Sequence, residues 1–199
     1  MVLAYHLILS AYGFWLPNDP RGSWSTYVGS RRLYALGGVA TKVDTHRSVA
    51  GVSHDRAQRL ATKRGLKRPP VRFTGKQAQA IGEGLRDYCE RNALPCCALA
   101  LMPDHVHLVV GRRPEMPIEK AAEHLKARAS RFLRESGLHP FEAEADARGR
   151  VPTVWAAGSW AVYLDDAAAA DRAVKYVEAN PVKAGMRAQR YGWVVAFGG

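Results

Sequence analysis

Two short apolar runs, separated by a single turn, constrain the fold of this chain most strongly. Residues Pro95 to Met102 and His105 to Gly111 are each of strand length, and Pro103-Asp104 between them is a turn-forming pair. The two runs therefore predict a β-hairpin. Because an isolated hairpin is marginally stable in water, its apolar face needs further strands or a covering helix.

The segments around this hairpin predict the rest of an α+β domain. Apolar residues recur at helical spacing from Thr74, a helix-capping residue, to about Arg91, and again from about Pro117 to Glu135. The remaining patterns predict strands within Met1 to Trp15 and Val151 to Leu164, a last strand at Tyr191 to Phe197, and a helix at Asp165 to Ala179 that ends because Asn180 precedes Pro181. This order favours helices packed over one antiparallel sheet.

Residues 16–70 interrupt this pattern. The stretch is rich in Gly, Pro, Ser and Arg, and it ends in the basic cluster Lys63, Arg64, Lys67 and Arg68. Loops of this length in compact domains are usually functional or partly disordered. We therefore expect one domain over residues 1–199 with a long irregular insertion at about 16–70.

The charge of the chain indicates its kind of partner. Its 199 residues include 29 Lys and Arg against 18 Asp and Glu, a formal net charge of +11. So basic a protein attracts polyanions, but charge alone leaves DNA, RNA and an acidic membrane surface open. No apolar run reaches the roughly 20 residues that span a bilayer, and no signal peptide is evident. We therefore expect a cytoplasmic protein with no membrane partner.

The first candidate for chemistry is the His-Val-His sequence of the hairpin. Strand side chains alternate, so His105 and His107 emerge on one face while Val106 and Leu108 point into the core. Two neighbouring imidazoles are a ready pair of metal ligands. The alternative is a chance His-x-His on the solvated face of a basic protein.

The second candidate is the pair Tyr176 and Asn180, which share a face at positions i and i+4 of a helix. A phenol is a weak nucleophile unless a metal polarises its target, although tyrosines do form covalent intermediates. Asn180 offers a neutral oxygen to the same metal. The alternative makes Tyr176 a packing residue and Asn180 a helix cap.

Together, "MPDHVHLVV" and "YVEANPVKAG" resemble the two motifs of single-tyrosine HUH transposases (His-hydrophobic-His), in particular the REP-associated tyrosine transposases. The segment "YHLILSAYGFWLPNDPRGSW" is also similar to the start of one branch of that group. The resemblance implies a ferredoxin-like antiparallel sheet with helices packed on one face and the histidines on the open face of a central strand. It also implies His105, His107 and Asn180 as ligands of Mg or Mn, and Tyr176 as the nucleophile that forms a 5′-phosphotyrosine with single-stranded DNA.

A protein of this kind is expected to bind single-stranded or hairpin DNA, to associate with the nucleoid when bound, and to form a homodimer. The expected contacts are basic helical residues, for each of which a solvated surface is an equally good explanation: Lys126, Arg128, Arg131, Arg134, Arg172 and Lys183. The run from Asn18 to Gly22 either reads a DNA hairpin or forms a tight turn.

Two other functions remain open. A replication- or mobilisation-type HUH nickase shares the same chemistry, although the Asn-Pro-Val sequence and the small size favour a transposase. A domesticated, non-catalytic DNA- or RNA-binding protein is consistent with the basic charge and the α+β fold, but it has no need of the histidine pair and the tyrosine.

Overall fold

The structure, a computed structural model, describes residues 1–45 and 49–198. The chain forms two compact units, of which the first consists of Met1–Ala11 and Arg72–Gly199 and the second of Tyr12–Val71. No helix among the described residues is long and apolar enough to cross a membrane.

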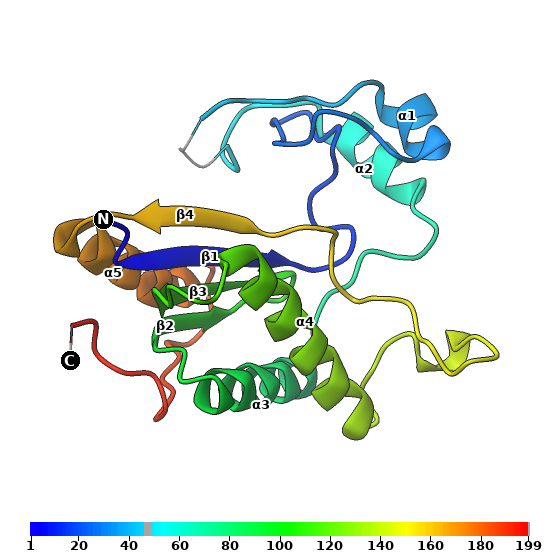
Figure 1. Cartoon of the computed structure of the whole chain (residues 1–199). Coiled ribbons are helices and arrows are strands. Elements are labelled where there is room, and N and C mark those ends of the chain that lie inside the picture. Colours follow the sequence, from blue (N-terminus) through cyan, green and yellow to red (C-terminus); the bar gives the residue numbers. More distant parts are fainter. Residues whose placement is uncertain (46–48, 199) are drawn as a thin grey trace. The chain divides into compact units, whose positions relative to one another are not determined.

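A four-stranded antiparallel sheet forms the centre of the first unit (Figure 1). Its strands are β1 (Ala4–Ser10), β2 (Cys96–Leu101), β3 (His105–Gly111) and β4 (Trp160–Leu164), in the spatial order β2-β3-β1-β4. The predicted hairpin is β2 and β3, and β3 is a central strand because it pairs with both β1 and β2. This strand order, with helices between β1 and β2 and between β3 and β4, is ferredoxin-like, as predicted.

Helices α3 (Gly75–Arg91) and α4 (Ile118–Glu135) pack together on one face of this sheet (Figure 1). A capping box starts α3, in which Thr74 accepts from the backbone of Gln77 and the Gln77 side chain accepts from Thr74. The two helices cross closely at Gly84, whose position leaves no room for a Cβ beside the Ala129 backbone. Their covered sheet residues include Leu7, Leu9, Val106, Leu108 and Val110, all fully buried.

Helix α5 (Ala167–Lys183) packs on the other face of the sheet, the histidine face. Its buried residues Ala170, Ala173 and Val177 join Ala4 and Val109 in a second apolar cluster. The histidine face is therefore open only in part. The reason is that Ala98, Ala100 and their neighbours on this face are as apolar as those on the other and need a cover.

The helix also runs further than the sequence predicted. It was expected to end before Asn180 because Asn180 precedes a proline, but it continues through Pro181 to Lys183. The steric bias of a residue before proline is a preference, and here buried Pro181 packs with the rest of the helix. Tyr176 and Asn180 consequently lie one turn apart on continuous helix.

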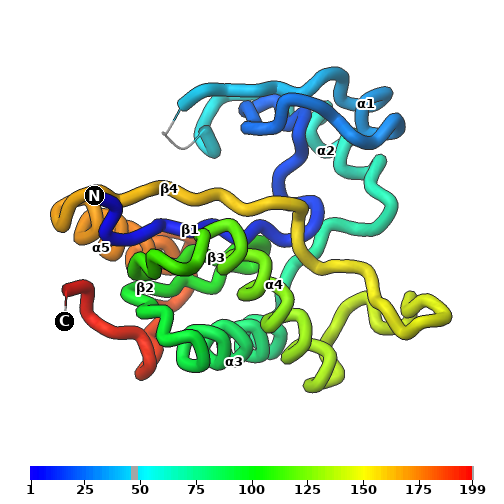
Figure 2. The backbone as a smooth tube through the Cα atoms, viewed as in Figure 1, coloured from blue at the N-terminus to red at the C-terminus, as the bar shows by residue number. Residues whose placement is uncertain are grey.

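The C-terminal tail lies along the edge of β2 without forming the predicted strand (Figure 2). The Gln189 side chain accepts from the Leu101 amide and donates to the Leu101 carbonyl, at 2.8 and 2.9 Å. One backbone bond joins Val195 to Cys96. The Gln189 side-chain amide thus bonds to part of the β2 edge, and the strand predicted at Tyr191 to Phe197 does not form.

The second unit is less irregular than its sequence suggests. It contains two short helices that pack together, α1 (Arg31–Gly37) and α2 (Arg56–Arg64). Ser30 and Asp55 cap their N-termini. The two ends of the unit lie close together, because the Val71 amide donates to the Tyr12 carbonyl at 2.9 Å.

Candidate active site

His105 and His107 lie side by side on the histidine face of β3, as the alternation of strand side chains predicts. Their Nε2 atoms are 3.0 Å apart. His107 is buried, with 5% of its surface exposed, and His105 is half-buried. The two rings therefore direct the same type of nitrogen toward a common point.

Each of the two rings is held at its other nitrogen by a protein group. Asp104 Oδ1 lies 2.8 Å from Nδ1 of His105, and Arg72 is paired with the second oxygen of Asp104 at 3.3 Å. His6 of β1 places its Nε2 2.9 Å from Nδ1 of His107. Partners of this kind fix the orientation and tautomer of imidazoles that bind metals.

Sequence reasoning missed His6. The only local signal is that His6 alternates with Tyr5 and Leu7 and so belongs to the face opposite these apolar residues. Its proximity to His107 follows from the register, in which Ile8 pairs with His107 and His6 lies diagonal to it. A register between strands about 100 residues apart cannot be read from one sequence.

Burial keeps two of the three rings neutral. Desolvation, helped by neighbouring His105 and His6, lowers the pKa of His107 to about 2. Burial also lowers the pKa of His6 to about 4. Both rings are therefore uncharged at pH 7, where each carries one N–H donor and one nitrogen lone pair.

Tyr176 faces this cluster from α5. Its ring stands edge-on to His107 and to His6, with ring centres 5.8 and 5.7 Å apart. The side chain is 43% exposed, so one side of the phenol contacts the histidines and the other meets solvent. Lys183 Nζ lies 5.6 Å from the centre of the same ring. The structure thus brings together the predicted tyrosine and the predicted histidines.

Asn180 provides the test of whether these residues fit a metal. Over residues 1–45 and 49–198, no three His, Cys, Asp or Glu side chains are grouped to hold an ion. Asn180 belongs to another residue type, and its Nδ2 is buried with no hydrogen-bond partner among the described residues. An amide can turn either its oxygen or its nitrogen to a given point, and a buried amide without a partner costs about 1–3 kcal/mol. The Asn180 amide is therefore available to a ligand, and two imidazole nitrogens with one amide oxygen are a donor set whose chemistry suits a divalent cation.

Four of the predicted DNA-binding cations lie away from this cluster, on α4 and hence on the opposite face of the sheet: Lys126, Arg128, Arg131 and Arg134. The Lys126 amino group donates to the carbonyls of Ala156 (2.9 Å) and Gly158. Burial lowers the pKa of Lys126 to about 8. Two of the three N–H donors of this amino group are therefore used within the protein, which leaves one for a phosphate.

Two of the arginines on α4 are in ion pairs. Arg128 Nε lies 2.5 Å from Asp87 on α3, and this contact is the main reason that the pKa of Asp87 is lowered to about 2. Arg134 pairs with Glu142 at 2.9 Å. Arg131 is exposed. The roles of these cations in DNA binding stay predictions.

The other two predicted cations, Arg172 and Lys183, are exposed on α5, the helix that carries Tyr176. Arg172 lies one turn before the tyrosine and Lys183 about two turns after it. These two cations share an element with the candidate nucleophile, so they are the better placed of the six to hold a strand beside it.

The run from Asn18 to Gly22 forms a tight turn within the second unit. Asp19, whose side chain is fully buried, pairs with Arg21 through two contacts of 2.8 Å. The Arg21 guanidinium also lies 3.7 Å from the centre of the Trp15 ring, and Asn18 donates to the carbonyl of Leu33. The Asp19 carboxylate, the Arg21 guanidinium and the Asn18 Nδ2 are thus bound inside the unit, which favours the turn over a DNA-reading loop, while the buried Asn18 Oδ1 has no partner among the described residues.

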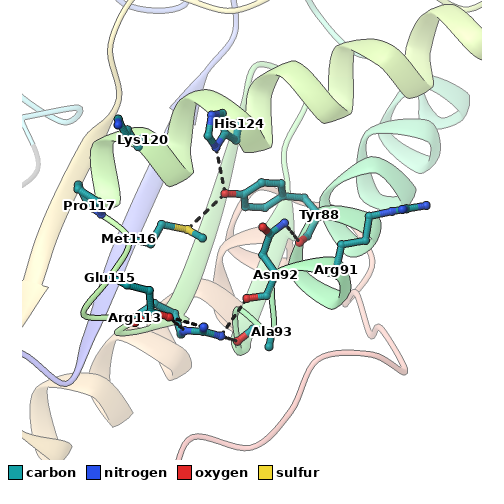
Figure 3. A pocket seen from close by; sticks show the side chains of 10 residues that line it. All are labelled: Tyr88, Arg91, Asn92, Ala93, Arg113, Glu115, Met116, Pro117, Lys120 and His124. Atoms are coloured by element: carbon teal, nitrogen blue, oxygen red, sulfur yellow. Dashed lines mark hydrogen bonds and ion pairs between the residues drawn. The ribbon is translucent and has the colours of Figure 1, made fainter.

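A hollow of about 550 Å³ lies at the C-terminal end of α3 and the start of α4 (Figure 3). In it the Tyr88 hydroxyl contacts Met116 Sδ and His124 Nδ1, each at 3.3 Å. Arg113 is bound to the carbonyls of Asn92 and Ala93. The lining includes neither His105, His107 nor Tyr176, so this hollow is separate from the candidate active site.

A ferredoxin-like sheet with paired histidines on a central strand, facing a tyrosine on a helix, is the arrangement of the HUH class of proteins. Within that class the chain belongs to the IS200-like transposase family, whose model ("Transposase IS200 like") matches residues 66–180. The match contains His105, His107, Tyr176 and Asn180, whereas His6 lies outside it.

Two solved structures resemble the chain. A candidate transposase from Deinococcus radiodurans R1 is 18% identical, with a TM-score of 0.41 and coverage of 89% of this chain and 90% of that one. A REP-associated tyrosine transposase bound to a REP hairpin is 11% identical, with a TM-score of 0.47 and coverage of 92% and 69%. None of the curated proteins compared with the chain matches it.

Proposed function

We propose that this protein is a metal-dependent DNA transposase that cuts and rejoins single-stranded DNA through a 5′-phosphotyrosine at Tyr176. The observation that carries the proposal is the edge-on contact of Tyr176 with His107, beside the paired Nε2 atoms of His105 and His107. Membership of the IS200-like transposase family supports the reaction class.

His105, His107 and Asn180 are the residues that would hold Mg or Mn. When bound, the divalent ion supplies charge withdrawal from the scissile phosphate and orients it for in-line attack. Imidazole favours Mn, while a mixed nitrogen and oxygen site also accepts Mg. Because burial keeps His107 neutral, its lone pair is available at neutral pH.

In the cutting step, Tyr176 Oη attacks the phosphorus and forms a P–O bond. The bond between phosphorus and the 3′ oxygen of the preceding nucleotide breaks, and that oxygen takes up a proton to leave as a 3′-hydroxyl. The phenol proton passes to solvent, with which the exposed side of Tyr176 is in contact.

The rejoining step reverses the same bonds. A 3′-hydroxyl from another strand attacks the phosphotyrosine, a new phosphodiester forms, and Tyr176 recovers its proton. One P–O bond is exchanged for another, so strand transfer needs no external source of energy.

The net charge of +11 favours a polyanionic substrate. Single-stranded or hairpin DNA suits a site of this shape, because a backbone phosphate must reach a partly covered sheet face beside α5. Arg172 and Lys183 are the cations placed on that helix. We further propose that the protein works as a homodimer, which sedimentation or light scattering tests directly.

The deciding experiment incubates the purified protein with labelled single-stranded hairpin DNA from its own genomic flanks, with Mn or Mg, and analyses the mixture on a denaturing gel. The wild type should give a covalent protein–DNA band that requires the metal. Tyr176→Phe should give none, because it lacks the attacking oxygen.

Tyr163→Phe is the matched control. Tyr163 is 50% exposed, close to the 43% of Tyr176, but its hydroxyl contacts Glu119 of α4 on the other face of the sheet. This variant should form the adduct at the wild-type rate. Tight DNA binding by folded wild type without any adduct would instead indicate a non-catalytic binding protein, and an adduct that survives Tyr176→Phe would identify another nucleophile.

A further inference from the structure

His6 contacts both halves of the candidate active site, although it lies in neither sequence motif. Its Nε2 is 2.9 Å from His107 Nδ1, and the planes of the two rings differ by only 25°, so the rings lie edge to edge as an in-plane hydrogen bond requires. Its ring edge also meets Tyr176, at 5.7 Å between ring centres. One side chain from β1 therefore touches the candidate ligand and the candidate nucleophile.

The hydrogen bond between His6 and His107 can run in only two directions. In the first, His107 carries its proton on Nδ1 and donates it to His6, which leaves the lone pair of His107 Nε2 directed toward His105. In the second, His6 donates to His107 Nδ1, and the proton of His107 sits on Nε2, where it blocks a metal. Only the first direction permits His107 to act as a ligand.

The neighbouring histidine has the matching arrangement. Asp104 Oδ1, an acceptor, lies 2.8 Å from His105 Nδ1, so the proton of a neutral His105 sits on Nδ1 and its Nε2 lone pair faces His107. In these tautomers the two Nε2 lone pairs face each other at 3.0 Å, where they repel unless a cation binds to both of them. His6 then does for His107 what Asp104 does for His105.

We propose that His6 is a positioning residue, which accepts the Nδ1 proton of His107 and so holds its Nε2 lone pair toward the metal. This inference rests on the proposed metal site of His105, His107 and Asn180. His6 is not a third ligand, because it contacts the nitrogen of His107 that points away from His105. The lack of any three grouped histidine or acidic side chains among the described residues agrees with that distinction.

The first test measures Mn²⁺ binding to the full chain by isothermal titration calorimetry, with two variants that separate the hydrogen bond from the ring. His6→Gln keeps an acceptor at about the position of Nε2 but loses the ring. His6→Phe keeps the ring contact with Tyr176 but cannot accept a proton. Loss of an outer partner typically weakens a metal site about 10- to 100-fold, so His6→Phe should lose affinity in that range. His6→Gln should stay within a few-fold of the wild type.

His124→Phe is the control for a generic histidine loss. His124 lies on α4 and contacts Tyr88 on the far side of the sheet, so its replacement should leave the Mn²⁺ affinity unchanged. Thermal unfolding of each variant checks that the fold is retained. Wild-type Mn²⁺ affinity in folded His6→Phe overturns the proposal.

A second test needs no metal. Long-range proton–nitrogen NMR correlations report which ring nitrogen of each histidine is protonated. We expect the Nδ1–H tautomer of His107 in the wild type and in His6→Gln, and a mixture of tautomers in His6→Phe. An Nε2–H tautomer of His107 in the wild type overturns the positioning role, even if the protein binds Mn²⁺ and forms the Tyr176 adduct. Conversely, failure of the wild type to bind Mn²⁺ refutes the metal site, and the adduct gel separately judges the role of Tyr176.

Discussion

Asn180 is the residue at which stability and activity are expected to separate. Its buried Nδ2 has no partner in the described parts of the chain, so its amide contributes little to folding. Replacing an unsatisfied polar group by an apolar one of similar shape is nearly neutral or stabilising, and Leu is a better helix former than Asn. Asn180→Leu should therefore melt at the same temperature as the wild type or higher, while adduct formation in Mn²⁺ falls about 10-fold or more.

Asn92 offers the opposite case and serves as the control. Its Nδ2 donates to the Tyr88 carbonyl at 2.8 Å at the C-terminal end of α3. Asn92→Leu should lower the melting temperature, because a bond at the helix end is lost, and leave the adduct rate unchanged. Normal adduct formation by Asn180→Leu would contradict its role as a ligand, and a lower melting temperature would assign Asn180 a structural role.

Lys126 gives a prediction about pH. Its pKa is lowered from 10.5 to about 8, chiefly by burial, with Glu123 opposing the shift. Between those two values the unfolded chain binds more protons than the folded one, so the free energy of unfolding gains a term that rises with pH. Below about pH 8 the lysine is charged in both states and the term is constant. Urea unfolding at several pH values should show the wild type gaining stability relative to Lys126→Met between about pH 8 and 10.5. Parallel curves would contradict the lowered pKa.

At the scale of secondary-structure elements, the close crossing of α3 and α4 at Gly84 is the most sensitive contact. A Cβ at this position would lie 2.8 Å from Ala129 Cα and 2.9 Å from the Arg128 carbonyl, both backbone atoms. Overpacking costs about 1–3 kcal/mol, and a gain in helix propensity of up to about 1 kcal/mol offsets part of it. Gly84→Ala should therefore lose about 1–2 kcal/mol in chemical denaturation.

Gly75→Ala is the control on the same helix. Gly75 has nothing within 4 Å of an added Cβ, so this change should be neutral or stabilise by about 0.4–1 kcal/mol. Neither variant should change Mn²⁺ affinity, because the crossing of α3 and α4 lies on the face opposite His107. If Gly84→Ala were as stable as Gly75→Ala, the two helices would have room to move apart.

The elements that the sequence predicted are those with local signals. The turn at Pro103-Asp104 marked the hairpin, and Thr74 marked the start of α3. The predicted C-terminal end of α5 was wrong, because the packing of buried Pro181 outweighed the preference of a residue before proline for a non-helical conformation. The strand predicted at Tyr191 to Phe197 was also wrong. The edge of β2 is bound there by the side chain of Gln189 and not by a further strand. Local sequence patterns contain no information about the tertiary contacts that decided these two segments.

In the candidate site, too, local spacing predicted some features and tertiary packing determined the others. His105 and His107 are two residues apart, and Tyr176 and Asn180 four, so strand and helix periodicity place each pair. That the two pairs come together depends on packing across the sheet, which the motif resemblance implied. His6 needed the register between β1 and β3, and the burial of Lys126 needed the path of residues 156–158. Neither the register nor the path of this segment can be predicted from the local sequence.

At the scale of the whole molecule, the charge is divided unevenly between the two units. Tyr12–Val71 contains eleven Lys and Arg against three Asp and Glu, and so carries +8 of the total +11. Several of its cations are exposed in the structure: Arg31, Arg32, Arg56, Arg64 and Lys67. The unit also exposes Tyr27 and Tyr34, by 73% and 54%. Exposed cations with aromatic rings are typical of surfaces that bind the nucleic-acid backbone and stack on bases.

This division predicts that affinity for DNA and chemistry on DNA can be separated by deletion. Because Tyr12 and Val71 are hydrogen-bonded to each other, a short Gly-Ser linker from Ala11 to Arg72 can replace the second unit. The shortened chain keeps the whole sheet, α3, α4 and α5, and should unfold cooperatively and bind Mn²⁺ as the full chain does. Its DNA affinity should be weaker, and its logarithm should fall less steeply with the logarithm of salt concentration, because fewer counterions are released.

Fluorescence anisotropy with a labelled hairpin, at several salt concentrations, measures both quantities for the two proteins. A full-length variant with Arg31, Arg32, Arg56, Arg64 and Lys67 changed to Gln is the matched control, and it should reproduce the shallower slope without any deletion. At saturating DNA and low salt, the shortened chain should still form the Tyr176 adduct, because the groups proposed for the reaction all lie in the first unit. An unchanged slope in both variants would instead mean that the first unit holds the phosphates, and would turn attention to Arg172 and Lys183 beside the tyrosine.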